Sequence, residues 1–135
     1  MRIMLLLLTL LVAAPASATA ADDGSAAQNV IRRQEQALAR DDAATAYAEA
    51  APEIHAIFPS PDIFMAMVKQ GYAPVYRHKS FEFGETKTDG GKIAQRVHII
   101  DANGEAWDAL YTLETQADGS LKITGCSLLK AGQSV

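Results

Sequence analysis

His55 is the residue in this sequence best suited to proton transfer. It lies between Ile54 and Ala56 in a short segment without clear periodicity, and burial can move the pKa of an imidazole toward the value that a general base needs. A tyrosine hydroxyl, from Tyr72 or Tyr76, would then donate the hydrogen bond that stabilises the reacting group. This combination suits a small lyase, isomerase or hydrolase. A histidine at the surface or at the rim of a pocket explains the same position, and we favour that interpretation.

Two glutamines, Gln34 and Gln95, fall at positions that the hydrophobic pattern assigns to the core. An unpaired buried amide costs about 1–3 kcal/mol, so each needs a partner, which is a ligand, a buried backbone group or the other glutamine. Aromatic residues add apolar walls with polar handles that suit a small organic molecule, although core packing alone also accounts for them. The candidate pocket residues are Gln34, His55, Tyr72, Tyr76, Gln95, Trp107 and Tyr111.

Other reactive residue types are less well placed for chemistry. His55, His78 and His98 lack the close spacing of metal ligands, and we expect neither a metal nor a cofactor. Arg77 could bind an anion, but a salt bridge to an acid is the simpler interpretation. Cys126 is the sole cysteine, so it cannot form an internal disulfide. We interpret it as a small buried residue, with an intermolecular disulfide or a reactive thiol as the alternative.

The first twenty residues have the pattern of a secretory signal peptide. Arg2 is followed by an apolar run over residues 3–12 and then by small residues, whereas a membrane-spanning helix needs about twenty apolar residues. We expect cleavage after Ala20, with a cut after Ala18 and a retained anchor as alternatives. The protein is therefore predicted to be exported, either periplasmic or secreted, without stable membrane insertion after cleavage.

Size and charge restrict the remaining possibilities. Without residues 1–20 the chain has about 115 residues, which is the size of one domain. We assign residues 25–130 to this domain and 131–135 to a tail. The full chain has 12 basic and 16 acidic residues and a formal net charge of −4. Nucleic acid is not an expected partner, because such binding needs a surplus of Lys and Arg on one face.

The first half of the domain predicts three helices, over residues 25–40, about 41–50 and 60–71. Ser25 has the position of a capping-box residue, and Asp41 or Asp42 can cap the second helix. Ser60 precedes Pro61, and proline is favoured at the first helical position. The segment 52–58 is ambiguous. The apolar face of the third helix consists of Phe64, Met67 and Val68.

The second half changes to the period of two that is typical of strands. Four strands are predicted, around Phe81 and Phe83 and over residues 93–99, 107–113 and 121–128. Asn103-Gly104 and Asp118-Gly119 are hairpin signals, and a bulge at Gly125 would bring the end of the last strand back into phase. The chain is therefore predicted to be an α+β domain whose helices cover one face of a four-stranded antiparallel sheet.

Several motifs between Gln28 and Leu128 resemble a known bacterial family. The most specific are the segment Gly71-Tyr72-x-x-Val75-Tyr76-Arg77 and the terminal Gly125-Cys126. On these residues the chain is similar to the family called domain of unknown function 4864, although Leu121 stands where an aromatic residue is expected. The resemblance implies a nuclear transport factor 2-like, or cystatin-like, cone related to the SnoaL group, with about three helices on a curved sheet. It implies no activity and transfers no catalytic residue.

The leading hypothesis is a non-catalytic exported domain that binds a small apolar or amphipathic ligand in the cup of the cone, or pairs through the open face of its sheet. The first alternative is the small lyase, isomerase or hydrolase that would use His55. The second is a structural homodimer. Ala94, Ile100 and Leu110 lie on sheet faces that are otherwise polar, which permits pairing without requiring it.

Overall fold

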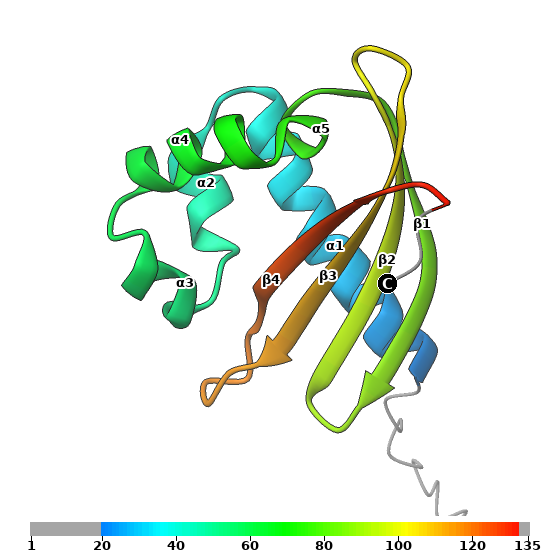
Figure 1. Ribbon diagram of the computed structural model, residues 1–135. Helices are drawn as coiled ribbons and strands as arrows, with labels where there is room; N and C mark the ends of the chain where they lie inside the picture. The colour runs from blue at the N-terminus through cyan, green and yellow to red at the C-terminus, as the bar shows by residue number, and fades with distance from the viewer. Residues whose placement is uncertain (1–19, 133–135) are drawn as a thin grey trace, which may run out of the picture.

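The computed structural model describes residues 20–132 of the 135-residue chain. The predicted leader, apart from Ala20, and most of the predicted tail lie outside these residues. Within the described part, five helices precede four strands (Figure 1). The helices are α1 (Ala20–Ala39), α2 (Ala43–Ala48), α3 (Pro52–Ile57), α4 (Pro61–Gly71) and α5 (Ala73–Tyr76). The strands are β1 (His78–Asp89), β2 (Lys92–Asp101), β3 (Ala106–Thr115) and β4 (Leu121–Lys130).

Helix α1 has the predicted buried face but not the predicted start. Val30, Ile31 and Leu38 are buried, as the period of 3.6 residues indicates. The helix begins at Ala20, so the prediction that Ser25 caps it is wrong. Alanine is the strongest helix former, and an acid such as Asp23 is favourable near the positive end of a helix, so the helix extends past Ser25.

The next helices begin at the predicted caps. The Thr45 backbone N–H donates to Asp42 at 3.1 Å, and the Ile63 N–H donates to the Ser60 hydroxyl at 3.2 Å. The ambiguous segment forms α3, whose first residue is Pro52. The short helix α5 was not predicted, and it holds Pro74 in its first turn, where the missing N–H costs nothing.

The strands form one antiparallel sheet in the order β1-β2-β3-β4. The predicted bulge in β4 is present: Gly125 pairs with Thr112, but Ile123 pairs with Leu113, which leaves Thr124 as the extra residue. A second irregularity, between Phe83 and Thr86 of β1, was not predicted. Gly84 lies there, and a Cβ at this position would be 2.7 Å from the His98 ring.

All five helices lie on one side of the sheet, with α1 packed along it, α2 to α4 grouped beyond β4, and α5 packed against β2 and α1 (Figure 1). The chain is therefore an α+β domain, as predicted. Its core forms where α1 meets the sheet, and the largest side chains that are fully buried there are Tyr111, Ile31, Leu38, Ile99, Leu113 and Gln95. None of the helices in residues 20–132 is both long enough and apolar enough to span a membrane.

Candidate functional site

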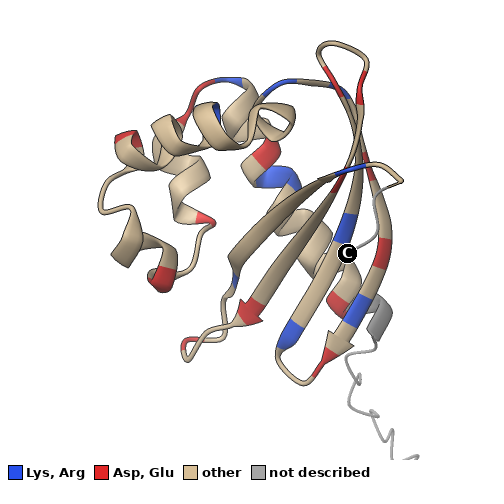
Figure 2. Cartoon of the chain, viewed as in Figure 1, with Lys and Arg blue, Asp and Glu red and all other residues tan. Residues whose placement is uncertain are grey.

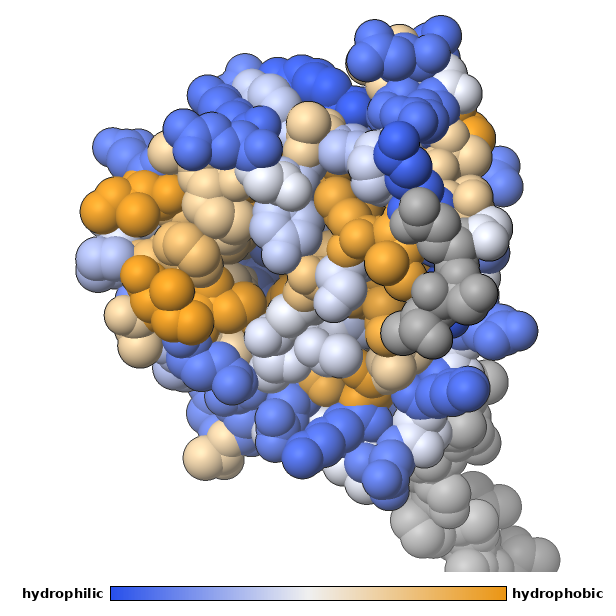
Figure 3. All heavy atoms as spheres, viewed as in Figure 1, coloured by the Kyte–Doolittle hydropathy of each residue, from blue (hydrophilic) through white to orange (hydrophobic). Residues whose placement is uncertain are grey.

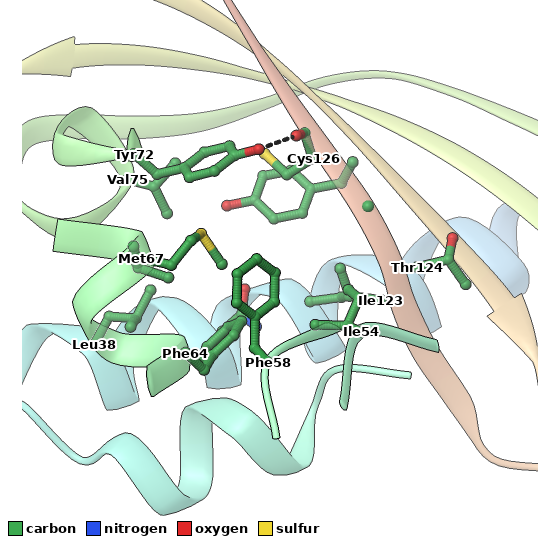
Figure 4. A pocket seen from close by; sticks show the side chains of 14 residues that line it. Leu38, Ile54, Phe58, Phe64, Met67, Tyr72, Val75, Ile123, Thr124 and Cys126 are labelled. Atoms are coloured by element: carbon green, nitrogen blue, oxygen red, sulfur yellow. Dashed lines mark hydrogen bonds between the residues drawn. The ribbon is translucent and has the colours of Figure 1, made fainter. Parts of the chain in front are cut away.

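An apolar pocket of about 360 Å³ lies between the helices and the concave side of the sheet (Figure 4). Aromatic and sulfur-containing side chains form much of its lining. Figure 4 shows Tyr72 and Cys126 on one side of the cavity and Phe58 and Phe64 on the opposite side. Met67 projects between these two sides.

Local sequence features explain how these walls form. Phe64, Met67 and Val68 follow the i, i+3, i+4 spacing that places side chains on one helix face, so α4 turns all three toward the pocket. The bulge at Thr124 turns Cys126 to the same side as Ile123. The Tyr72 hydroxyl then donates a hydrogen bond of 2.9 Å to the Cys126 carbonyl, which joins the end of α4 to β4.

Burial controls the titration of the polar groups in these walls. Burial raises the pKa of the Tyr72 hydroxyl and raises that of the Tyr111 hydroxyl well above its usual range. Burial also raises the pKa of the Cys126 thiol to about 12, although the neighbouring Tyr111 hydroxyl acts in the opposite direction. All three groups therefore stay protonated at neutral pH, and Cys126 is not a reactive nucleophile there.

Gln34 is the buried amide of the pocket. The residue is only 6% exposed, and its Nε2 donates to the Ala46 carbonyl at 3.2 Å. Within residues 20–132, Gln34 makes no other side-chain hydrogen bond, and no side-chain nitrogen or oxygen that is sealed from solvent lacks a partner. Its Oε1 is therefore accessible from the pocket that the residue lines.

The pocket is electrically neutral. Among the described residues that line it, none is an Asp, Glu, Lys, Arg or His. Figure 2 shows charged residues near both ends of β4 but not in its middle, which lines the pocket. In an apolar site without a counter-charge, a neutral guest is strongly favoured over an ion.

His55 does not line the pocket. Its ring stacks on Tyr47 with 3.7 Å between centroids, and its Nε2 lies 2.7 Å from the Tyr47 carbonyl. The Tyr47 hydroxyl in turn donates to the Phe58 carbonyl at 2.6 Å. His55 and Tyr47 thus attach α3 to α2, and the structure gives the histidine a positioning role for one wall of the pocket.

Tyr76, Gln95 and Trp107 also lie outside the lining. The Tyr76 hydroxyl donates a short hydrogen bond to Asp41, and the Arg77 guanidinium lies against both groups. The Trp107 indole N–H donates to the carboxylate of Asp101 at the end of β2, and Gln95 bonds to the backbone of β1 and β2. Of the seven candidates, the pocket brings together Gln34, Tyr72 and Tyr111.

Sequence reasoning missed several lining residues. Phe58 and Ile54 lie in the segment that showed no clear periodicity, and Cys126 was interpreted as a packing residue. Phe64 and Met67 were predicted to lie on the apolar face of a helix but were not assigned to a pocket. That apolar face is the signal in the sequence that could have identified them. The position of α4 across the pocket from β4 depends on tertiary structure, and no local sequence pattern predicts it.

A separate ionisable cluster joins α1 to the start of β1. His78 Nε2 lies 3.0 Å from Glu35, and Arg32 donates to the same carboxylate at 2.7 Å. The hydrogen bond to Glu35 raises the pKa of His78. Burial alone would raise the pKa of Glu35, but the hydrogen bonds from His78 and Arg32 outweigh it and lower that pKa. In the described part of the chain no three His, Cys, Asp or Glu side chains gather as a metal site would require.

Comparison with known proteins gives one match. The family profile named domain of unknown function DUF4864 matches residues 20–134. No curated protein and no solved structure matches the chain. The profile spans both the helices that carry the pocket and the whole sheet, and the chain therefore belongs to the DUF4864 family.

Proposed function

We propose that this protein binds a small, uncharged apolar or amphipathic molecule in the pocket between α4 and β4, without transforming it. The observation that carries the proposal is the pocket itself, with its volume of about 360 Å³ and its apolar, aromatic lining. Binding sites for small molecules typically have volumes of about 300–1,000 Å³ and the same predominance of apolar walls.

The lining favours a ligand that contains a ring. Phe58, Phe64, Tyr72 and Tyr111 supply rings to the cavity, and aromatic pairs add about 0.5–1.5 kcal/mol to the burial of apolar area. Because no lining residue among those described carries a charge, a charged ligand group would lose its hydration without gaining a counter-ion. The ligand is therefore neutral in the part that enters the pocket.

An apolar surface beside the pocket supports an amphipathic or elongated ligand. Ile57 of α3 and Ile63 of α4 are 70% and 49% exposed, and they adjoin the lining residues Phe58 and Phe64 in the sequence. Figure 3 shows hydrophobic atoms over α3 and α4, beside a hollow at the centre of this view. Exposed apolar groups of this kind are common at binding sites, and here they can cover the part of a ligand that extends beyond the cavity.

The proposal includes the compartment and the fold class. The leader-like pattern of residues 1–20 supports export to the periplasm or the medium. The arrangement of helices on the concave side of a four-stranded antiparallel sheet supports a nuclear transport factor 2-like cone. The intact mass of protein recovered from the exported fraction tests export, because cleavage after Ala20 leaves a chain that begins at Ala21. A protein found only inside the cell at full length would contradict it.

Titration with N-phenyl-1-naphthylamine, an uncharged fluorescent ring compound, tests the binding proposal. We expect saturable binding at one site in the unmodified protein. Met67→Trp fills the cavity and should abolish binding, whereas Gln70→Trp, on the exposed side of the same helix, should retain it. Native mass spectrometry of gently purified protein should show a small bound mass that follows the same pattern. Absence of saturable binding, or equal binding by both variants, would refute the proposal.

A further inference from the structure

We infer that the ligand of this pocket carries a hydrogen-bond donor, a hydroxyl or N–H group, that binds to Oε1 of Gln34. The inference rests on the proposed function, since it concerns the chemistry of the molecule that occupies the same pocket. It favours neutral alcohols, phenols and amides or amines that keep an N–H over pure hydrocarbons, ethers and carboxylate anions.

The orientation of the Gln34 amide follows from its one protein partner. A backbone carbonyl can only accept a hydrogen bond, so the side-chain atom that lies 3.2 Å from the Ala46 carbonyl must be the nitrogen. The oxygen then points away from Ala46. Since Gln34 is 6% exposed and lines the pocket, it offers a ligand the acceptor Oε1 together with the second N–H of its amide.

The opposite wall also offers an acceptor. The Tyr72 hydroxyl has a single hydrogen, and the hydrogen bond of 2.9 Å to the Cys126 carbonyl uses it. What remains for a ligand at Tyr72 is a pair of oxygen lone pairs. Tyr111 pairs with Cys126 between β3 and β4. Gln34 Oε1 and the Tyr72 hydroxyl oxygen are therefore two acceptors for a donor on the ligand.

A ligand without a donor would leave Gln34 Oε1 shut off from water and unpaired. Sites built to hydrogen-bond a ligand discriminate strongly against analogues that lack the matching group, because the buried protein group then loses its partner. A carboxylate would place negative oxygens against Oε1 with no counter-charge among the described lining residues. We expect a preference of about tenfold for a donor over the matching ether.

The test compares 2-naphthol with 2-methoxynaphthalene, which has the same ring system and no donor. Each compound displaces N-phenyl-1-naphthylamine from the purified protein, and the ratio of the two affinities is the readout. We expect 2-naphthol to bind about tenfold more tightly to the unmodified protein. In Gln34→Met, which has an apolar side chain of similar length, the ratio should fall close to one. Gln36→Met, on the exposed side of the same helix, should retain it.

The outcomes separate this inference from the proposed function. Equal affinities for the two naphthalenes in the unmodified protein would overturn the inference and leave the pocket as a binding site. A preference for 2-naphthol that persists in folded Gln34→Met would also overturn it, because another group would then be the acceptor. If neither compound nor the fluorescent probe binds, the proposed function fails and the inference fails with it. The comparison in the unmodified protein holds even if Gln34→Met does not fold.

Discussion

Gln34 and Gln95 occupy similar places in the hydrophobic pattern, but the structure gives them different partners. Gln95 is fully buried, and its Nε2 donates to the carbonyls of Gly84 and Arg96 at 3.1 and 2.8 Å. The Thr86 hydroxyl donates to its Oε1. Gln95 thus satisfies backbone groups that the irregularity in β1 leaves unpaired, and Gln34 keeps one acceptor for the pocket. The sequence indicates that both amides are buried, but the partners of Gln95 depend on that irregularity and the partner of Gln34 depends on the packing of α1 against α2.

Substitution of Gln95 should affect stability and leave binding intact. Gln95→Leu removes the partners of two backbone carbonyls and a hydroxyl, so the free energy of unfolding should fall by about 1–3 kcal/mol. Affinity for N-phenyl-1-naphthylamine should be unchanged in the folded variant. Urea unfolding and probe titration measure the two quantities, with exposed Gln36→Leu as the control. Unchanged stability, or loss of binding by folded Gln95→Leu, would show that its role is assigned wrongly.

The Cys126 thiol should be unreactive in the native protein. With its pKa raised to about 12 by burial, its thiolate fraction at pH 8 is about a thousandfold below that of an ordinary cysteine. Alkylation by iodoacetamide, followed by mass spectrometry, should therefore be slow in buffer and fast in denaturant. Rapid modification of the native protein would mean that the wall formed by Tyr72 and Cys126 is open.

Because of the contact between His78 and Glu35, the free energy of unfolding should be greatest in mildly acidic solution. The pKa of His78 is raised from 6.5, so its contribution is complete below about pH 6.5 and is lost as the pH rises through the folded value. The pKa of Glu35 is lowered from 4.5, so its contribution is complete above about pH 4.5 and is lost as the pH falls through the folded value. Urea unfolding from pH 4 to 9 should show a loss of stability on the alkaline side that His78→Gln removes and His98→Gln retains. An unchanged alkaline loss in His78→Gln would contradict this account.

At the level of elements, α3 is the least firmly held wall of the pocket. None of its residues is buried, yet it carries Ile54 into the lining and leads directly to Phe58. Tyr47 of α2 holds it through side-chain contacts. The Tyr47 ring stacks on the His55 ring, and the Tyr47 hydroxyl donates a hydrogen bond to the Phe58 carbonyl. Elements with few buried contacts open most readily, so we expect a ligand to enter past α3.

Tyr47→Phe should loosen this wall selectively. The substitution keeps the ring that stacks on His55 and removes the hydroxyl that donates to the Phe58 carbonyl at 2.6 Å. Hydrogen exchange of the α3 amides should accelerate, and the probe should dissociate several-fold faster, since a net hydrogen bond contributes about 0.5–1.5 kcal/mol. Exchange in α1 should not change. If α3 exchange is the same in both proteins, Tyr47 does not hold this helix.

The elements themselves follow largely from local chemistry, whereas the pocket does not. The caps at Asp42 and Ser60, the two hairpins and the bulge in β4 were all predicted from residue types and periodicity, and the structure confirms them. The start of α1 was missed because a capping-box pattern does not prevent a helix from extending beyond it. The pocket lies between α4 and β4, and their relative position is encoded in no single segment.

For the molecule as a whole, the position of the pocket separates the binding account from a sheet-based scaffold. The pocket lies on the concave side, among the helices. The outer face of the sheet carries exposed Leu110 beside the contact of His98 Nδ1 with Asp108 Oδ1, two atoms that lie 2.6 Å apart. A small molecule and a second protein would therefore use opposite sides of the domain, and one experiment can distinguish them.

Methyl-detected NMR during titration with 2-naphthol is the decisive test of whether a small neutral molecule binds between α4 and β4. We expect saturable shifts for the methyl groups of Met67, Ile123 and Val75, which line the pocket. The methyl groups of Ala94 and Leu110, on the outer face of the sheet, should not move. Shifts confined to the outer face, or the absence of saturable shifts at the lining methyl groups, would contradict the claim that this domain binds a small neutral molecule between α4 and β4.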